Sequence, residues 1–266
     1  MTTITLTKHH GLGNDFLVVF HPPNADLAAL ARRLCDRRRG IGADGLLVGD
    51  SEPGYAARMV LYNADGSRAE MSGNGIRCFA QALSMRRGDL VPLHILTDAG
   101  DRLVDLTATS DPTVIDAAVD MGEVTELAAP ADWHRLGCDP MRPVSHLSLG
   151  NPHSVVAVDE VGEVDLATLG LAVPYVNLEV VEPGPEPSAV TMRVHERGAG
   201  ITQACGTGAC ATAWAAHQWG LVAPAVTEIT VHMDGGDAKV RLHQPSHGRV
   251  TLVGPAQFIG TVSVEV

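Results

Sequence analysis

The sequence contains little of what several classes of enzyme and binding protein require. Its 266 residues include only two lysines, Lys8 and Lys239, and neither stands in an obvious cofactor-binding loop. This disfavours a pyridoxal Schiff base, and we expect no cofactor. The net charge is −12, and the only dense basic run, Arg37 to Arg39, ends a predicted helix, so we expect no nucleic-acid-binding surface. Histidine pairs such as His9-His10 lack metal-ligand spacing and acidic partners, and no metal site is expected.

Long apolar runs are also missing. No apolar stretch approaches the ~20 residues that span a bilayer, and residues 1–8 alternate like a strand instead of showing the layout of a signal peptide. The five cysteines are odd in number and form no C-x-x-C pair, which favours reduced thiols over a disulfide framework. We therefore expect a cytoplasmic protein that does not associate with membranes.

The most informative feature is a glycine loop that occurs twice. Ser72-Gly73-Asn74-Gly75 is matched, 133 positions later, by Cys205-Gly206-Thr207-Gly208. An alanine-rich helical run follows each loop, over Ile76–Met85 and Ala209–Trp219, and both runs are apolar nearly all round. A helix that is apolar on all sides is buried. Two such loop-to-helix segments predict two similar domains that face one site.

The remaining pattern predicts a mixed α/β fold. Short strands at Ile4–Lys8 and Phe16–Phe20 precede a helix over Asp26–Arg39, with Asn24 as its cap. Further strand-like runs surround both glycine loops. We expect two pseudo-symmetric domains of the α+β type, each a curled, mostly antiparallel sheet around a central helix, with the division near residues 114/115.

The two loops suit one kind of chemistry. The start of a helix offers unpaired N–H groups and a partial positive charge, which together bind anions such as a carboxylate. A thiol at this position has a stabilised thiolate, so we expect the pKa of Cys205 to fall toward neutral. Two helix starts that hold one carboxylate would place one side chain on each face of its α-carbon. Removal of a proton from one face and return to the other would invert that carbon.

The motifs resemble those of the diaminopimelate epimerase family over essentially the whole chain. The first half carries His10-Gly11-Leu12-Gly13-Asn14-Asp15-Phe16, Gly40-Ile41-Gly42-Ala43-Asp44-Gly45, Asn63-Ala64-Asp65-Gly66-Ser67 and Gly73-Asn74-Gly75-Ile76-Arg77-Cys78. The second half carries Gly150-Asn151-Pro152-His153, Asn177 after a strand, and Glu196-Arg197-Gly198-Ala199-Gly200 through Gln203-Ala204-Cys205-Gly206-Thr207-Gly208. Each motif is weak alone, but their order and spacing are specific.

The resemblance implies cofactor-independent interconversion of LL- and meso-diaminopimelate, for lysine and peptidoglycan synthesis. Cys205 would be one acid/base group, and His153 would lie near the reacting centre, where it can help to set thiol protonation. Backbone amides of Gly73, Asn74, Gly206 and Thr207 would bind the reacting carboxylate. The substrate's amino groups and distal carboxylate would be held by Asn14, Asn63, Asn151, Asn177, Glu196 and Arg197. The family also implies a homodimer, and a last strand (257–266) that completes a first domain of residues 1–114 beside a second of 115–256.

One position departs from the family pattern. The residue before Gly73 is normally the second catalytic cysteine, and here it is Ser72. A serine hydroxyl is a much weaker acid than a thiol and needs a neighbour to accept its proton; His153 or Glu196 can serve. Three hypotheses stand: a working epimerase with a Ser72/Cys205 pair, an isomerase or eliminase on another amino or hydroxy acid, and an impaired homologue that binds diaminopimelate. Serine at this position is compatible with hydroxyproline epimerisation in the related proline racemase family.

Overall fold

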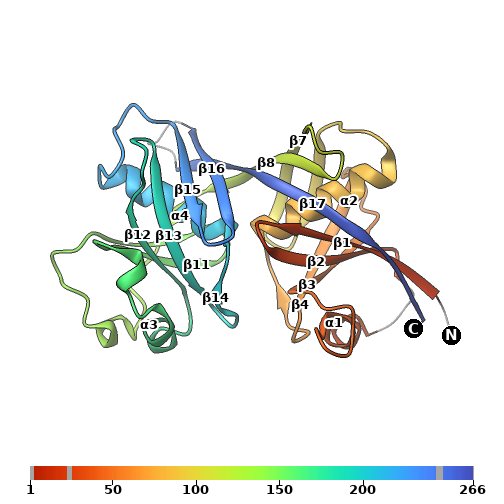
Figure 1. The fold of residues 1–266 in the computed structure, drawn as a ribbon, viewed down its shortest axis with the longest axis horizontal. Helices are drawn as coiled ribbons and strands as arrows, with labels where there is room; N and C mark the ends of the chain where they lie inside the picture. The colour runs from red at the N-terminus through yellow and green to blue at the C-terminus, as the bar shows by residue number, and fades with distance from the viewer. Residues whose placement is uncertain (1–2, 23–25, 244–247, 266) are drawn as a thin grey trace. The chain divides into compact units, whose positions relative to one another are not determined.

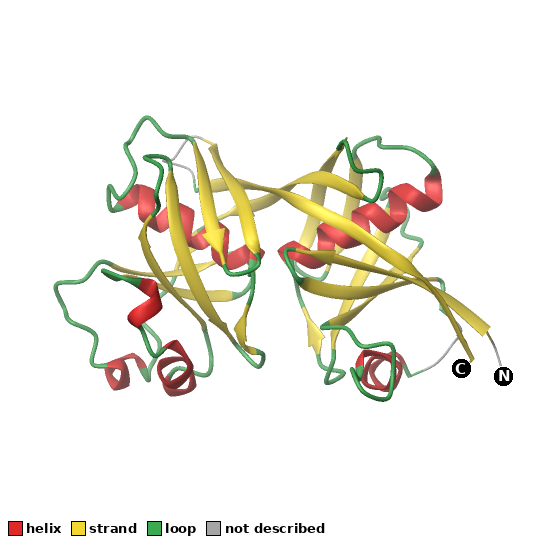
Figure 2. Cartoon of the chain, in the orientation of Figure 1, coloured by secondary structure: helices red, strands yellow, loops and turns green. Residues whose placement is uncertain are grey.

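The computed structural model describes residues 3–22, 26–243 and 248–265, and it confirms the mixed α/β class, with strands predominating over helices (Figures 1 and 2). The chain divides into two compact units. The first unit comprises Met1–Asp120 and Gly254–Val266, and the second comprises Met121–Val253. No helix within the described ranges is both long and apolar enough to cross a membrane.

The first unit is built mainly from the first half of the chain. Its elements are β1 (Thr3–Gly11), β2 (Asn14–Phe20), α1 (Leu27–Cys35), β3 (Gly45–Asp50), β4 (Ala57–Asn63), β5 (Arg68–Ala69), α2 (Gly73–Arg87), β6 (Leu93–Thr97), β7 (Gly100–Ala108) and most of β8 (Val114–Glu123). β2 and β3 pair in parallel, β3 and β4 pair antiparallel, and β4 and β6 pair in parallel. The latter part of β17 (Arg249–Glu265) pairs antiparallel with β1 in the same unit.

The second unit repeats this order. Its elements are β9 (Thr125–Glu126), η1 (Trp133–Leu136), β10 (Val144–Ser148), β11 (Pro152–Ala157), η2 (Val161–Glu163), α3 (Leu166–Ala172), β12 (Asn177–Pro183), β13 (Ala189–Glu196), β14 (Gly200–Thr202), α4 (Gly206–Gln218), β15 (Glu228–Met233) and β16 (Gly236–His243). β11 and β12 pair in parallel, β12 and β13 pair antiparallel, and β13 and β15 pair in parallel. Strand for strand, β10 to β16 therefore correspond to β1 to β7, and α3 and α4 correspond to α1 and α2.

Each unit holds one buried helix against its strands. Helix α2 packs on β1, β2, β3, β4 and β7, and α4 packs on β10 to β13, β15 and β16. Small side chains let α4 approach its strands closely, and Ala209, Ala211 and Ala213 have no exposed surface. Helix α2 is capped by Gly88, which has a positive φ of 76° and donates its N–H to the Ser84 carbonyl. These helices are the two runs that the sequence marked as buried.

Helix α1 is shorter than the sequence predicts. It ends at Cys35, not Arg39, because the backbone of Asp36 leaves the helical conformation (φ −58°, ψ 118°) and its carboxylate accepts hydrogen bonds from the N–H groups of Arg38 and Arg39. Its N-cap is Asp26, whose Oδ1 accepts from Ala29 N at 3.0 Å. The predicted cap, Asn24, lies outside the described residues.

Candidate active site

Cys205 stands at the N-cap of α4. Its backbone is extended, and its Sγ accepts a hydrogen bond from Gly208 N at 3.3 Å. Gly206 and Thr207 form the first buried turn of the helix, and Thr207 Oγ1 lies 3.5 Å from Sγ. Cys205 is only 4% exposed. The fold therefore places a nearly enclosed sulfur at a helix start, beside a hydroxyl.

Ser72 holds the corresponding position at the N-cap of α2. Its backbone is also extended, and its Oγ accepts from Gly75 N at 3.0 Å. Gly73 and Asn74 form the buried first turn. Among the described side chains of the first unit, none accepts a hydrogen bond from the Ser72 hydroxyl. Ser72 is thus placed like Cys205 but has no base beside it in its own unit.

A buried polar pair lies beneath the start of α4. His153 on β11 and Glu179 on β12 have no exposed surface, and their Nδ1 and Oε1 atoms are 2.6 Å apart. His153 Nε2 lies 3.0 Å from Asn151 Oδ1, and Asn151 Nδ2 donates to Thr207 Oγ1 at 3.1 Å. The structure thus brings the predicted residues His153, Asn151, Thr207 and Cys205 into one group.

Three further predicted residues of the second unit are neighbours. Asn177 pairs with His153 across β11 and β12, and its Oδ1 accepts from the Arg197 N–H at 2.8 Å. Glu196 ends β13 and accepts a hydrogen bond from the Thr202 hydroxyl. Arg197 is exposed, whereas Asn177 is buried. These residues flank the polar pair, with Arg197 at the surface.

The predicted binding residues of the first unit form a second network. Asn74 Nδ2 donates to Asn14 Oδ1 at 3.2 Å, and Asn14 Nδ2 donates to Asp44 Oδ2 at 2.6 Å. Arg77, which is fully buried in α2, donates to Asn74 Oδ1 at 2.8 Å. Asn63, at the exposed end of β4, donates instead to Ser67 Oγ at 3.0 Å and stands outside this network.

Sequence reasoning missed the ion pairs that support Asn14. Arg37, which we placed at a helix end, donates to Asp15 at 2.6 Å and to Asp44 at 2.7 Å. Burial opposes ionisation of Asp15, but the hydrogen bonds from Arg37 and Lys8 more than offset it and hold the pKa of this carboxyl below its ordinary value. The motif spacing gave no signal of this contact, because Arg37 reads as one member of a basic run.

The expected fall in the pKa of Cys205 is wrong. Burial raises the pKa of this thiol well above its ordinary value, and the nearby carboxylates Glu196 and Glu179 raise it further. The hydrogen bonds from Thr207 and Gly208 act in the opposite direction but are smaller. The helix start favours a thiolate, yet removal of water from the sulfur outweighs that effect.

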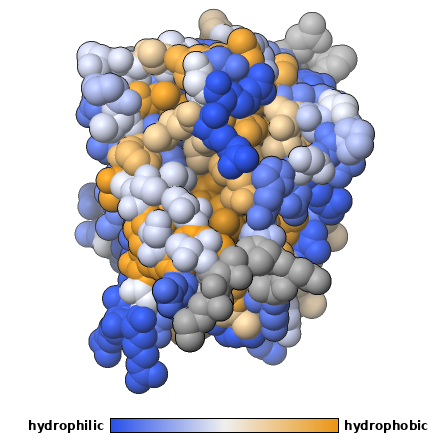
Figure 3. Space-filling model, turned by 90° about the vertical axis from the view of Figure 1, so that its right-hand side faces the viewer, coloured by the Kyte–Doolittle hydropathy of each residue, from blue (hydrophilic) through white to orange (hydrophobic). Residues whose placement is uncertain are grey.

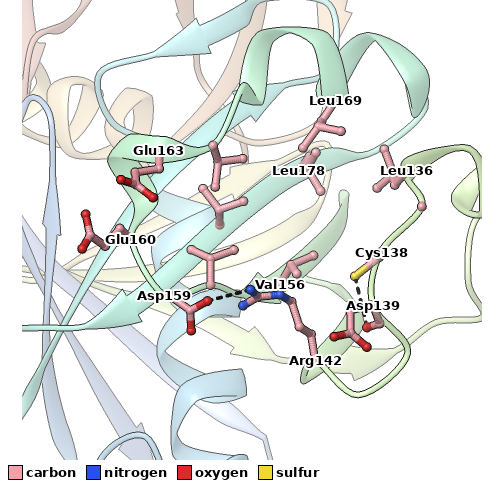
Figure 4. Close-up of a pocket in the computed structure, with 14 residues that line it drawn as sticks. Leu136, Cys138, Asp139, Arg142, Val156, Asp159, Glu160, Glu163, Leu169 and Leu178 are labelled. Atoms are coloured by element: carbon pink, nitrogen blue, oxygen red, sulfur yellow. Dashed lines mark hydrogen bonds and ion pairs between the residues drawn. The ribbon is translucent and has the colours of Figure 1, made fainter.

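The cavity shown in Figure 4 lies on the other face of β12 and is separate from these residues. It has a volume of about 410 Å³, and Leu178 and Val180, which flank Glu179 in the strand, help to line it. Since neighbouring strand residues point to opposite faces, Glu179 faces α4 while these two face the cavity. None of the predicted site residues lines it. Within the described ranges, no three His, Cys, Asp or Glu side chains gather as metal ligands would.

Comparison with known proteins identifies the family. The diaminopimelate epimerase family model matches residues 6–127 and 146–259. The diaminopimelate epimerase of Desulfitobacterium hafniense is 37% identical over 96% of this chain and 95% of its own length. That of Thermosynechococcus vestitus is 39% identical over 98% of this chain and 99% of its own. The chain belongs to the diaminopimelate epimerase family.

Members of this family are isomerases, and the fold agrees with solved structures beyond the family. A phenazine biosynthesis protein of the PhzF family from Bacillus anthracis superposes with a TM-score of 0.78, covering 100% of both chains at 14% identity. At this identity the likeness concerns the fold alone. Within this fold, the N-cap side chains Ser72 and Cys205 and the hydrogen-bond networks around them are the features that need a chemical explanation.

Proposed function

We propose that this chain converts LL-diaminopimelate to meso-diaminopimelate by a cofactor-independent, two-base transfer of the α-proton, as a step in lysine and peptidoglycan precursor synthesis. The observation that carries the proposal is the matched placement of Ser72 and Cys205 at the N-caps of two corresponding buried helices. One group removes the α-proton from one face, and the other donates its proton to the opposite face.

The reacting carboxylate is bound by backbone N–H groups at the two helix starts. Gly73 and Asn74 supply the first set, and Gly206 and Thr207 supply the second. The carboxylate withdraws charge from the α-carbon most effectively when these donors are already in place. Since both first turns are buried, the donors are largely removed from competing water.

The rest of the substrate carries amino groups and a second carboxylate. Arg197 presents an exposed guanidinium whose fork matches a carboxylate, and Glu196 offers a carboxylate to an ammonium group. The four remaining binding residues are amides, which suit both kinds of group: Asn14, Asn63, Asn151 and Asn177. This combination favours diaminopimelate over a substrate with only one zwitterionic end.

A second candidate function follows from the surroundings of Ser72. Among the described side chains of the first unit, none accepts the proton of the Ser72 hydroxyl, so this unit supplies no base for it. A protein that binds diaminopimelate and exchanges its α-proton only through Cys205 is therefore the alternative to a complete epimerase. Eliminase or isomerase activity on another amino or hydroxy acid finds no support in these contacts.

Proton NMR in D₂O separates these possibilities. LL- and meso-diaminopimelate are incubated separately with reduced protein, and α-deuteration and stereoisomer content are followed together. Interconversion with deuterium uptake supports the epimerase, and Ser72→Ala and Cys205→Ala should each abolish interconversion. Deuteration without interconversion, lost only in Cys205→Ala, supports the one-face alternative. Interconversion that survives Cys205→Ala would overturn the two-base mechanism.

We further propose that the protein acts as a homodimer in the cytoplasm. All five cysteines are free, which suits a reducing compartment. Large apolar side chains are exposed on the first unit, including Leu103 and Ile259, and Figure 3 shows apolar atoms among hydrophilic ones on one face of the molecule. Light scattering coupled to gel filtration measures the mass; a mass of one chain at micromolar concentration would contradict the dimer.

A further inference from the structure

Glu179 is a buried carboxylate for which neither the family motifs nor the proposed function has a use. It lies in β12 with no exposed surface, and one oxygen contacts His153 Nδ1 at 2.6 Å. Its other oxygen, Oε2, is buried without a hydrogen-bond partner among the described residues. A buried carboxylate with one unmet oxygen is costly, so its presence calls for a reason.

The internal repeat shows that packing is not the reason. The parallel pairing of Phe16 with Gly45 in the first unit corresponds to the pairing of His153 with Asn177 in the second. Two residues further along the second strand, Leu47 therefore corresponds to Glu179. Both Phe16 and Leu47 are buried, so the same fold forms with two apolar side chains where the second unit carries an imidazole and a carboxylate.

The corresponding residues also touch the same point of each central helix. A Cβ added at Gly75 of α2 would lie 3.4 Å from Leu47 Cδ2. A Cβ added at Gly208 of α4 would lie 2.7 Å from Glu179 Oε1. Each of these glycines donates its N–H to the N-cap side chain, Ser72 or Cys205. The polar residues His153 and Glu179 therefore lie in the unit whose N-cap side chain is the thiol. Their apolar counterparts, Phe16 and Leu47, lie in the unit whose N-cap side chain is the hydroxyl.

A continuous row of hydrogen bonds links Glu179 to the sulfur. It runs through His153, Asn151 and Thr207 to Cys205, with successive distances of 2.6, 3.0, 3.1 and 3.5 Å. The Asn151 amide sets its direction: the NH₂ group donates to Thr207, so the carbonyl oxygen faces His153 Nε2, which must carry a hydrogen. Thr207 Oγ1 accepts from Asn151 and keeps its own hydrogen for Cys205 Sγ.

We propose that Glu179 is a positioning residue for Cys205, acting through His153 and Asn151 to aim the Thr207 hydroxyl at the sulfur and so stabilise the thiolate. The role rests on the proposed function, in which that thiolate removes the α-proton. Glu179 and His153 Nδ1 share one proton, which leaves His153 Nε2 protonated and directed at Asn151. Without the contact to Glu179, the His153 ring can change its tautomer and the Asn151 amide can flip. The Thr207 hydroxyl then donates to Asn151 instead of to Cys205.

An alternative role for Glu179 would have the opposite effect on the thiolate fraction of Cys205. Among the described residues, Glu196 on β13 and Glu179 on β12 are the carboxylates whose charge raises the pKa of Cys205, and His153 on β11 contacts Glu179. If Glu179 acted only as a charge, its removal would increase the thiolate fraction. If it positions Thr207, its removal decreases that fraction. The direction of the change decides between the two.

The test measures the rate at which iodoacetamide alkylates Cys205 across pH, by peptide mass spectrometry, without any substrate. Alkylation of the half-exposed Cys138 in the same sample serves as an internal control for the reactivity of the reagent. The double variant His153→Phe/Glu179→Leu copies the first unit, which keeps the core apolar and packable. We expect it to slow alkylation of Cys205 at pH 7.5 by about tenfold, which corresponds to a rise of about one unit in the pKa of the thiol.

Two further variants define the controls. Glu179→Gln can donate from its amide to His153 Nδ1 and keep the direction of the row, so we expect it to retain most of the wild-type rate. Glu182→Gln, on the other face of the same strand, should leave the profile unchanged. An unchanged or faster alkylation of Cys205 in the double variant would overturn the proposal. Because the readout needs no turnover, failure of diaminopimelate epimerisation in the NMR experiment is a separate result.

Discussion

Ser72 Oγ and Cys205 Sγ each accept a hydrogen bond from the backbone N–H three residues later, at 3.0 and 3.3 Å. Both residues have extended backbone and precede a glycine that opens a buried helix. The two side chains therefore occupy one backbone position in two copies of the same local structure. They differ in acidity and in the buried residues beneath them, and the predictions below follow from that difference.

Replacement of Ser72 by cysteine should increase the rate of epimerisation, by about 100-fold if the hydroxyl limits proton transfer. The expectation follows because the described contacts of the first unit contain nothing specific to serine: the backbone N–H of Gly75 can bond a thiol as Gly208 does in the other unit. Coupled-enzyme or NMR rates on LL-diaminopimelate measure the effect. A lower rate in Ser72→Cys would show that the site is adapted to the hydroxyl.

Loss of Arg37 should weaken substrate binding more than it slows the chemistry. Arg37 holds Asp44, and Asp44 orients the Asn14 amide. The Arg37 side chain is 56% exposed, so we expect Arg37→Ala to raise KM for diaminopimelate up to about fivefold with little change in kcat. Arg38→Ala is the matched control. A fall in kcat at unchanged KM would place Arg37 in a different role.

Acid should destabilise the protein through His9. Burial lowers the pKa of His9 from 6.5 to about 4, although its hydrogen bond to Gln81 opposes the shift. Between these two values the unfolded chain binds a proton that the folded chain does not, so the free energy of unfolding falls as the pH falls. The contribution is up to about 1.4 kcal/mol per pH unit, and it is fully retained above pH 6.5.

Urea denaturation at pH 7, 6 and 5 measures this slope. His9→Gln, which keeps a donor for Gln81, should flatten it, whereas the exposed His134→Gln should not. Equal slopes in wild type and His9→Gln would assign the acid sensitivity to other groups.

Alanine at Gly208 should impair Cys205 more than alanine at Gly75 impairs Ser72. The new Cβ would meet the Cys205 and Ser72 side chains at similar distances, 3.2 and 3.1 Å, but at Gly208 it also approaches Glu179 Oε1 at 2.7 Å. Displacement of that carboxylate disturbs the row of hydrogen bonds that runs from Glu179 to the Cys205 thiol. We therefore expect about a 100-fold loss of activity in Gly208→Ala. Alkylation of Cys205 and NMR turnover check the comparison. Similar losses in both variants would argue against a special role for the contact.

The mixed α/β class and the two buried central helices could be predicted from the sequence, because apolar helical runs that follow glycine loops give strong local signals. The sequence overextended α1, since periodicity does not show that Asp36 binds two backbone N–H groups downstream. It did not reveal Glu179, which reads as one acidic residue in the strand-like run Tyr175–Val181; its contact with His153 follows only when β11 is placed beside β12. The pKa of Cys205 was misjudged for a similar reason, because burial is a property of the tertiary structure.

The correspondence of β1–β7 with β10–β16 makes each unit a structural reference for the other. Two copies of one strand order in a single chain separate what the backbone of that order requires from what each copy adds. Positions that agree in both copies, such as the glycines three residues after each N-cap, show what the backbone needs. Positions that differ, such as Leu47 and Glu179, mark where the backbone leaves the side chain free to serve the site.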